Sequence, residues 1–334
     1  MRIIVPMAGM GKRMRPHTLT VPKPLVPIAG KPIVQRLVED IAKVCGQQVD
    51  EVAFIIGNFG KEVENQLIKI AESVGAKGSI YYQDKPLGTA HAILCAGPSL
   101  DGNLVVAFAD TLFKADFTLD TSPDGTIWVQ KVEDPKPFGV VTLNDKGVIT
   151  KFVEKPETFV SDLAIIGIYY FKDGAYLKKE LQYLLDNDIK DKGEYQLTNA
   201  LDNMKNKGSN FIPGRVTEWL DCGNKDSTVQ TNERYLEYIK NENLVSKSAK
   251  LVNSMLIQPV YIGDDVEITN SVVGPHVSVG NGTKITDSIV KKSIIQEKTI
   301  VKNANINNSM LGSFASVEGK ALDLSVGDYN TIKL

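Results

Sequence analysis

Basic side chains surround two glycines near the start of the chain, in a pattern suited to binding a polyphosphate. Gly9 and Gly11 follow the apolar residues 3–5, and the segment up to residue 25 carries four cations, Lys12, Arg13, Arg15 and Lys23. A strand that ends in glycines exposes backbone N–H groups, and neighbouring cations add full positive charges. The segment therefore predicts an anion-binding loop for nucleotide chemistry.

Two well-known phosphate-binding motifs do not match this loop. A P-loop needs Ser or Thr after Gly-Lys, but Gly11-Lys12 is followed by Arg13. A dinucleotide fingerprint needs a third glycine three residues after Gly11, where this chain has Met14. A surface turn with incidental basic residues is the alternative. Lys23 argues against it, because the prolines on both sides of this residue restrict where its cation can point.

Short apolar runs alternate with helical patterns up to about residue 245, and these elements must position the loop. The predicted strands are 3–7, 51–56, 79–82 and 104–109, and the predicted helices are 31–44, 61–74 and 88–96. This alternation predicts an α/β fold with a Rossmann-like, mostly parallel sheet covered by helices. Ligands of such sheets bind at the carboxyl ends of the strands, which is where the glycine loop and Asp110 fall.

The pattern becomes strand-rich between residues 125 and 171. It predicts an antiparallel layer made of strands 126–132, 138–143, 148–153 and 163–171. Helices are expected after it, at 174–185, 195–205 and 227–240. We expect residues 1–245 to form the catalytic domain.

A six-residue period appears after about residue 250 and predicts a second domain, residues 246–334. Its aliphatic positions include Ile262, Ile268, Val273, Val279, Ile285, Ile295 and Val301, and serines recur at Ser254, Ser271, Ser288 and Ser309. Such hexapeptide repeats are typical of a left-handed parallel β-helix, with an ordinary β-sandwich as the alternative. The domain lacks the histidines of a hexapeptide acyltransferase, so we expect an assembly or regulatory role, with His276 in a solvent-facing turn.

Composition excludes several classes of function. Lys and Arg number 38 and Asp and Glu number 40, giving a net charge of −2, so the chain has no broad basic field for nucleic acid. The sequence shows neither a secretory signal nor about 20 consecutive apolar residues, which predicts a cytoplasmic protein without a membrane partner. Cys45, Cys95 and Cys222 have no metal-ligand spacing, and we expect them to be reduced thiols.

The glycine loop resembles the signature of the sugar-1-phosphate nucleotidylyltransferases, G-G-x-G-x-R-[LM]-x-P-x-T-x-x-x-P-K-x-L, most closely that of glucose-1-phosphate thymidylyltransferases. Ala8 stands where the first glycine usually is. The resemblance covers about residues 1–240. It implies a Mg²⁺-dependent enzyme that joins a nucleoside triphosphate, dTTP or UTP, to a hexose 1-phosphate such as glucose 1-phosphate, giving a nucleotide sugar and pyrophosphate. With the C-terminal domain it also suggests a homo-oligomer.

The resemblance implies roles for particular residues. The implied catalytic residues are Arg13, Lys23 and Asp110, and the implied metal ligands are Asp110 and Asp221, the latter in a W-x-D-x-G segment. The implied nucleotide-binding residues are Ala8, Gly9, Gly11, Arg13, Gln83, Pro86, Gly88 and Thr89. The implied sugar-phosphate-binding residues are Gly139, Glu154, Lys155, Gly167 and Lys192.

Departures from the family pattern keep other functions open. Lys192 replaces an arginine, Asn199 replaces an aspartate, and Asp110 lies in Ala-Asp-Thr where Gly-Asp-Asn is usual. One alternative is a mannose-1-phosphate guanylyltransferase, although Gln83 suits a pyrimidine because its amide can both donate and accept at the base edge. The other alternative is a regulatory or binding homologue without turnover.

Overall fold

The computed structural model describes residues 1–9, 11–320 and 322–333, and this part of the chain forms two compact units. Unit 1 comprises residues 1–26 and 31–227, and unit 2 comprises residues 27–30 and those from 228 onward. The structural division thus falls within α6 (Lys225–Tyr238), and the predicted domain boundary at residue 245 stays a prediction. No helix among the described residues is long and apolar enough to cross a membrane.

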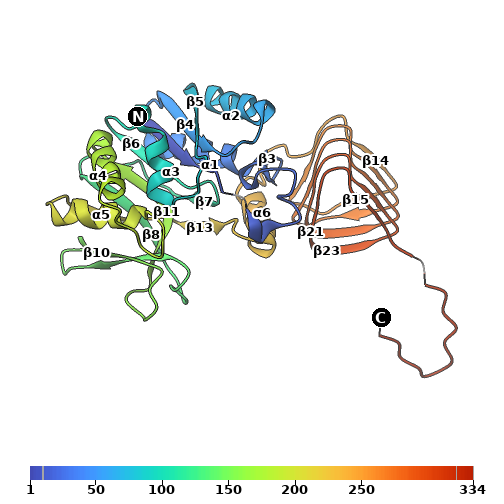
Figure 1. Cartoon of the computed structure of the whole chain (residues 1–334). Coiled ribbons are helices and arrows are strands. Elements are labelled where there is room, and N and C mark those ends of the chain that lie inside the picture. Colours follow the sequence, from blue (N-terminus) through green and yellow to red (C-terminus); the bar gives the residue numbers. More distant parts are fainter. Residues whose placement is uncertain (10, 321, 334) are drawn as a thin grey trace. The chain divides into compact units, whose positions relative to one another are not determined.

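A mixed sheet forms the centre of unit 1 (Figure 1), with nine strands in the described part of the chain. Its parallel half contains β1 (Arg2–Pro6), β4 (Glu51–Ile56), β5 (Lys77–Tyr82) and β6 (Leu104–Ala107). The chain reaches these strands through α1 (Ile33–Cys45), α2 (Lys61–Ser73), α3 (Thr89–Cys95) and the 3-10 helix η3 (Gly97–Ser99). The predicted α/β alternation with a parallel-dominant sheet is confirmed.

The strand-rich segment pairs antiparallel, as expected, and it continues the central sheet. β11 (Leu163–Phe171) pairs antiparallel with β6, and β8 (Gly125–Lys131), β9 (Gly139–Leu143) and β10 (Ile149–Glu154) extend the sheet from there. β12 (Phe211–Arg215) adds a parallel strand beside β8. Ile4 and Val106 of the parallel half are buried in one core with Tyr169 and Phe171 of β11, which favours a continuous sheet.

Helices α4 (Gly174–Asp186) and α5 (Leu197–Asn206) lie between β11 and β12 in sequence and pack on the sheet through Leu177, Leu181 and Leu201. Two short antiparallel strands, β7 (Thr111–Lys114) and β13 (Glu218–Asp221), form a separate pair. Sequence patterns did not predict them, because four-residue strands carry too little periodicity. Their pairing joins two segments more than a hundred residues apart and determines the site described below.

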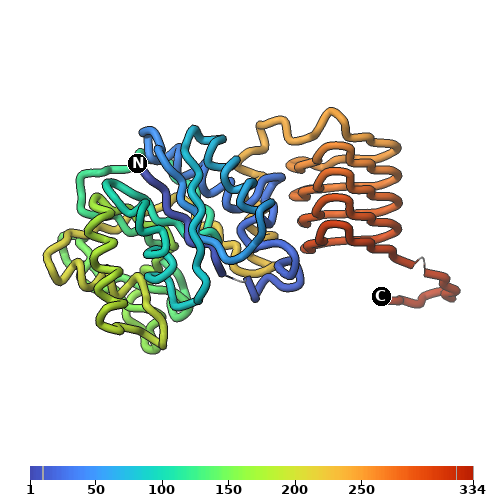
Figure 2. Tube along the Cα trace, turned by 45° about the horizontal axis from the view of Figure 1, so that its top comes forward, coloured from blue at the N-terminus to red at the C-terminus, as the bar shows by residue number. Residues whose placement is uncertain are grey.

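Unit 2 contains stacked coils (Figure 2). The described strand pairs between these coils are all parallel. One sheet contains β14 (Lys250–Val252), β17 (Glu267–Thr269), β20 (Lys284–Thr286), β22 (Ile300–Lys302) and β24 (Ser316–Glu318). Another contains β15 (Met255–Leu256), β16 (Val260–Ile262), β18 (Val272–Val273), β19 (Val277–Val279), β21 (Ile289–Ile295) and β23 (Asn305–Leu311). The predicted aliphatic positions, Ile262, Ile268, Val273, Val279, Ile285, Ile295 and Val301, are buried.

Serine ladders connect successive coils of unit 2. The backbone N–H of Ser271 donates to Ser254 Oγ at 3.1 Å, and that of Ser288 donates to Ser271 Oγ at 3.0 Å. The next rung is Ala304, not the expected Ser309, because the coil from Ser288 to Ala304 is 16 residues long; Ser309 donates to Ser293 instead. The prediction of a solvent-facing His276 is also wrong. Its Nε2 lies 2.7 Å from Glu237 Oε1 of α6, and its side chain is 19% exposed.

Candidate active site

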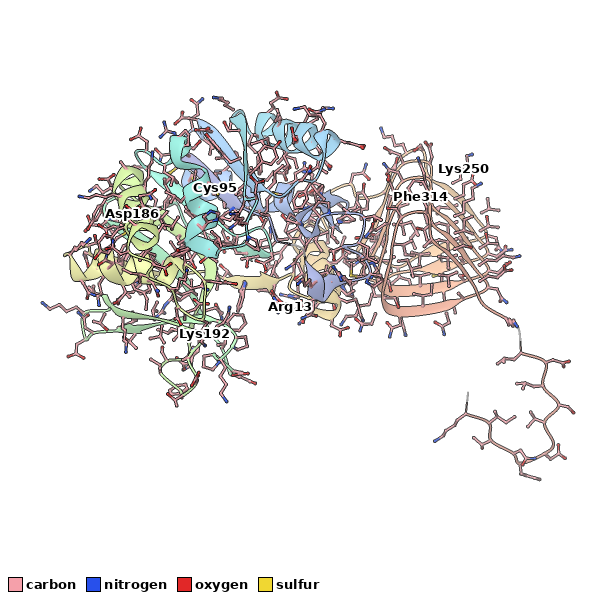
Figure 3. The ribbon with its side chains drawn as sticks, in the orientation of Figure 1. Arg13, Cys95, Asp186, Lys192, Lys250 and Phe314 are labelled. Atoms are coloured by element: carbon pink, nitrogen blue, oxygen red, sulfur yellow. The ribbon has the colours of Figure 1, made fainter. Side chains whose placement is uncertain are left out.

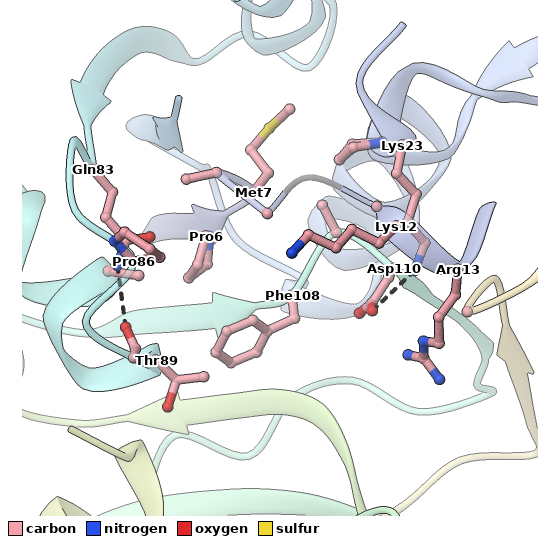
Figure 4. Close-up of a pocket in the computed structure, with 18 of the residues that line it drawn as sticks. Pro6, Met7, Lys12, Arg13, Lys23, Gln83, Pro86, Thr89, Phe108 and Asp110 are labelled. Atoms are coloured by element: carbon pink, nitrogen blue, oxygen red, sulfur yellow. Dashed lines mark hydrogen bonds and ion pairs between the residues drawn. The ribbon is translucent and has the colours of Figure 1, made fainter. Parts of the chain in front are cut away.

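A cavity of about 430 Å³ opens in unit 1 beside the glycine loop (Figure 4). Lys12, Arg13, Lys23 and Asp110 lie at one end, and Gln83, Pro86 and Thr89 lie at the other. All eight residues expected to bind nucleotide line it: Ala8, Gly9, Gly11, Arg13, Gln83, Pro86, Gly88 and Thr89. The cavity thus has a charged end suited to phosphates and a less polar end formed by the segment expected to recognise a base.

The loop packs closely on Lys23. Residues Lys12–Met14 and Lys23–Leu25 form the 3-10 helices η1 and η2, and Gly11 precedes η1 with a φ of 56°. A Cβ on Gly11 would lie 2.9 Å from Lys23 Cβ, whereas a Cβ on Gly9 would meet nothing within 4 Å. Gly11 therefore has both a conformational and a steric reason to be glycine, and Gly9 leaves space for a ligand against the backbone.

Gly88 allows the base-side loop to contact a distant segment. It has a φ of 117°, and a Cβ there would lie 2.7 Å from the backbone nitrogen of Tyr195. Gln83 Nε2 donates to the Gly88 carbonyl at 3.2 Å and lies 3.1 Å from His91 Nδ1. These contacts hold the Gln83 carboxamide in place at the wall of the cavity.

A second cavity of about 400 Å³ adjoins the first and shares four lining residues with it, Arg13, Thr89, Phe108 and Asp110. Gly139, Glu154 and Gly167, three of the residues expected to bind the sugar phosphate, line this second cavity. Thr198 Oγ1 donates to Glu154 Oε2 at 3.3 Å, which orients one carboxylate oxygen. A Cβ on Gly139 would lie 3.2 Å from the same oxygen, so glycine keeps this wall open.

Lys155 and Lys192 do not line either cavity. Lys155 is half-exposed and pairs with Glu154 at 3.5 Å, and Lys192 Nζ donates to the Lys155 carbonyl at 2.7 Å. Lys192 also lies apart from Arg13 (Figure 3). These two lysines are therefore adjacent to each other and to Glu154, and they do not converge with Arg13 on the shared wall.

The two aspartates expected to bind metal come together through the β7–β13 pair. Asp221 lies opposite Thr111 in the antiparallel register, and the Cys222 N–H donates to the Asp110 carbonyl at 3.0 Å. Both aspartates line the second cavity. Lys23, only 8% exposed, places its Nζ 3.0 Å from Asp110 Oδ2.

Two carboxylates at one cavity fit a magnesium ion. Mg²⁺ prefers hard oxygen ligands and keeps several waters, so one or two protein carboxylates suffice. In the described part of the chain no group of three or more His, Cys, Asp or Glu side chains forms a denser metal cluster. Asp110 and Asp221 thus suit a magnesium ion whose remaining ligands are substrate phosphates and water, and not an ion held by protein side chains alone.

Several lining residues were not assigned from the sequence. Glu194 lines the first cavity, and Phe108, Gln196, Thr198 and Trp219 line the second, Phe108 also bordering the first. Residues 194, 196 and 198 lie in the G-E-Y-Q-L-T-N segment, whose family likeness was visible. The sequence did not reveal that the side chains of residues 194, 196 and 198 face a cavity. Their direction depends on how the segment packs against Gly88.

Neither histidine of the loop segments is charged at neutral pH. Burial lowers the pKa of His17, with a smaller contribution from Lys225, and burial lowers the pKa of His91. Burial, followed by the charges of Glu154 and Asp110, raises the pKa of Tyr169, which lines the second cavity and stays protonated. The charges available at the site are therefore those of the lysines, the arginine and the carboxylates.

Residues 3–238 match the family model described as nucleotidyl transferase. The chain therefore belongs to the nucleotidyl transferase family, and the resemblance to sugar-1-phosphate nucleotidylyltransferases is confirmed. A solved structure of UDP-glucose pyrophosphorylase with UDP-glucose is similar in fold, with a TM-score of 0.58 at 24% identity, covering 71% of this chain and 98% of that one.

Curated relatives carry several names. The glycan biosynthesis nucleotidyltransferase Agl11 of Haloferax volcanii is 32% identical over 69% of this chain and 64% of its own length. A glucose-1-phosphate thymidylyltransferase of Streptomyces antibioticus is 30% identical over 81% of this chain and 80% of its own length. The bifunctional protein GlmU of Methanococcus maripaludis is 30% identical, but this chain spans only 59% of its length.

Proposed function

We propose that this chain transfers a nucleotidyl group from dTTP or UTP to a hexose 1-phosphate, with glucose 1-phosphate as the first candidate, giving a nucleotide sugar and pyrophosphate. The observation that carries the proposal is the pair of adjoining cavities with a shared wall containing Arg13 and Asp110. One cavity suits the triphosphate and base, and the other suits the sugar. The thymidylyltransferase relative, aligned over most of both chains, supports the same assignment.

The reaction follows from this arrangement. An oxygen of the sugar phosphate attacks the α-phosphorus, the new O–P bond forms, and the bond from the α-phosphorus to the bridging oxygen breaks as pyrophosphate leaves. The nucleophile is already an anion, so no general base is needed, and alignment with charge neutralisation supplies the catalysis. Arg13 and Lys23 neutralise phosphate charge, while Gly139, Glu154 and Gly167 bind the sugar. Lys155 and Lys192 contact the sugar's phosphate in this proposal if their side chains turn toward the cavity.

Magnesium is part of the proposal. Asp110 and Asp221 are the residues that would hold it, and both line the cavity proposed for the sugar phosphate. When bound there, Mg²⁺ supplies positive charge that stabilises the transferring phosphoryl group and the leaving pyrophosphate. The free thiols of Cys45, Cys95 and Cys222 are compatible with a cytoplasmic location, which we also propose.

Pyrophosphate release from a panel of substrates tests the function. The panel combines dTTP, UTP, GTP or ATP with glucose, galactose or mannose 1-phosphate in the presence of Mg²⁺. We expect a pyrimidine triphosphate with glucose 1-phosphate to give the highest kcat/KM, because Gln83 presents a fixed amide at the base end of the cavity. GTP with mannose 1-phosphate as the best pair would assign a guanylyltransferase, and no release from any pair would favour a regulatory homologue.

We propose further that the stacked parallel strands of unit 2 form a left-handed β-helix that mediates homo-oligomerisation. The strands repeat at 17 and then 16 residues, close to three hexapeptides per coil. Met255 and Ile289 are 60% and 49% exposed, and both lie in register with Val272. This aliphatic column is suited to burial against a second copy of the chain.

Sedimentation velocity tests self-association. We expect the full chain to sediment as a multiple of 36.6 kDa, and Ile289→Glu to shift it toward that mass, because a charge in the aliphatic column is costly to bury. Ile300→Glu is the matched control, since Ile300 is also 49% exposed but lies on the other sheet. A wild-type chain that sediments as a monomer at micromolar concentration would contradict the proposal.

A further inference from the structure

The segment 194–198 lies between the two cavities of unit 1. Glu194 lines the first cavity, whereas Gln196, Leu197 and Thr198 line the second. Thr89, at the start of α3, lines both. Residues of one short segment therefore contribute to both ligand sites, and Thr89 is their common neighbour.

Backbone hydrogen bonds join this segment to the base-side loop. The Tyr195 N–H donates to the Leu87 carbonyl and the Ala90 N–H donates to the Tyr195 carbonyl, both at 2.9 Å. These two bonds lie on either side of Gly88, whose missing side chain permits the contact. The loop that forms the base end of the first cavity and the segment that lines the second are therefore held as one piece.

The Gln196 side chain makes a third connection and uses both ends of its carboxamide. Its Oε1 accepts from Thr89 Oγ1 at 3.0 Å, and its Nε2 donates to Glu194 Oε2 at 3.1 Å. Gln196 is 5% exposed, so water does not readily replace these bonds. Thr89 Oγ1 also accepts from the Leu197 N–H at 2.9 Å, which leaves its hydroxyl hydrogen directed at Gln196.

The connection continues to the sugar side. Thr198 lies two residues after Gln196 at the start of α5 and donates to Glu154 Oε2 at 3.3 Å. A continuous set of hydrogen bonds and short chain steps thus runs from Glu194 in the first cavity, through Gln196 and Thr89, to Glu154 in the second. Gln196 is buried and Thr89 is partly buried, whereas Glu194 is exposed, so the hydrogen bond between Thr89 and Gln196 is the part of the link best protected from water.

We propose that Gln196 is a positioning residue that couples binding in the two cavities, so that a bound nucleotide raises affinity for the sugar phosphate. A nucleotide held against Gly88 and Thr89 orders the start of α3, and through Gln196 it also orders Thr198 and Glu154. The second ligand then binds to a site that is already arranged, which is positive cooperativity without a large movement. The inference rests on the proposed function, because it takes the two ligands to be a nucleoside triphosphate and a sugar 1-phosphate.

Calorimetric binding to the full chain tests the coupling without turnover. The nucleotide probe is the α,β-methylene analogue of dTTP with Mg²⁺, which lacks the scissile oxygen bridge, and the sugar probe is glucose 1-phosphate. The coupling factor is the Kd of the analogue alone divided by its Kd at saturating glucose 1-phosphate, and linkage requires the same factor in the reverse titration. We expect a coupling factor of about five or more for the wild-type chain.

Gln196→Leu removes both side-chain hydrogen bonds at similar volume and should reduce the coupling factor to about one, while each single-ligand Kd rises about two- to tenfold. Gln182→Leu is the matched control, because Gln182 is an exposed glutamine on α4 that lines neither cavity. It should keep the wild-type factor. Thermal melting of both variants checks that the fold is intact.

Three outcomes would overturn the inference. A wild-type chain that binds both probes independently has no coupling to explain. A Gln196→Leu chain that keeps the wild-type factor, even with a lowered melting temperature, would show that Gln196 is merely structural. A wild-type chain that binds neither probe would remove the proposed function and this inference together, which distinguishes that failure from the first two.

Discussion

Asp110→Asn should lower kcat/KM for pyrophosphate release by about 10³-fold. In the proposed mechanism Asp110 is one of two aspartates at the second cavity whose charge would hold a divalent ion, and that ion would stabilise the transferring group by several kcal/mol. Each 1.36 kcal/mol corresponds to about a factor of ten in rate. Asparagine keeps an oxygen that can accept from Lys23 Nζ, so the buried lysine retains a partner and the fold should persist.

Steady-state kinetics over a Mg²⁺ titration measures this effect, together with the melting temperature. Asp145→Asn is a suitable control, because Asp145 is an exposed residue between β9 and β10 that lines neither cavity. It should have wild-type kinetics. If the kcat/KM of Asp110→Asn stayed within about threefold of the wild-type value, Asp110 would not be a metal ligand. The proposed magnesium site would then be wrong.

Arg13→Ala is expected to lower kcat by about 10²- to 10³-fold, the usual cost of removing one donor that stabilises transition-state charge. Of the four residues shared by the cavities, Arg13 carries the positive charge, and its position on the common wall is where the α-phosphate would lie. The side chain is exposed, so its loss should change the melting temperature little. Arg13→Lys should recover part of the rate, because lysine restores the charge without the planar fork of donors.

Arg215→Ala provides the comparison for Arg13, since Arg215 is an exposed arginine on β12 outside both cavities. The two substitutions remove the same charge and the same atoms from different places. Equal activity of the two variants would mean that net charge, and not the position of Arg13, affects the reaction. A rise in KM for the triphosphate with unchanged kcat would assign Arg13 to ground-state binding only.

Local patterns in the sequence predicted much of this molecule. Apolar runs of four to six residues gave the parallel strands, and helical spacing gave α1, α2 and α3 to within about two residues at each end. The eight residues assigned to nucleotide binding all line one cavity, because they lie in two continuous segments, 8–13 and 83–89. Residues that are close in sequence stay close in space, so motif reasoning places them together.

Long-range pairing limited the predictions elsewhere. The expected antiparallel layer is part of the central sheet, because β11 pairs with β6. Lys155 and Lys192, assigned to the sugar phosphate from motifs, line neither cavity, and Lys192 Nζ donates to the Lys155 carbonyl; their role stays a prediction. His276 contacts a carboxylate of α6, about forty residues earlier in the chain, and no sequence period indicates such a contact.

The amino-acid sequence by itself determined the α/β alternation, the glycine loop after the first strand and the buried positions of the repeating coils, because each depends on spacing within a few residues. Tertiary structure alone decided that β7 pairs with β13, which brings Asp110 and Asp221 to one cavity. It also decided that Gln196 bridges Thr89 and Glu194. Such contacts depend on which distant segments bury surface against each other, and that is settled only when the whole chain has packed.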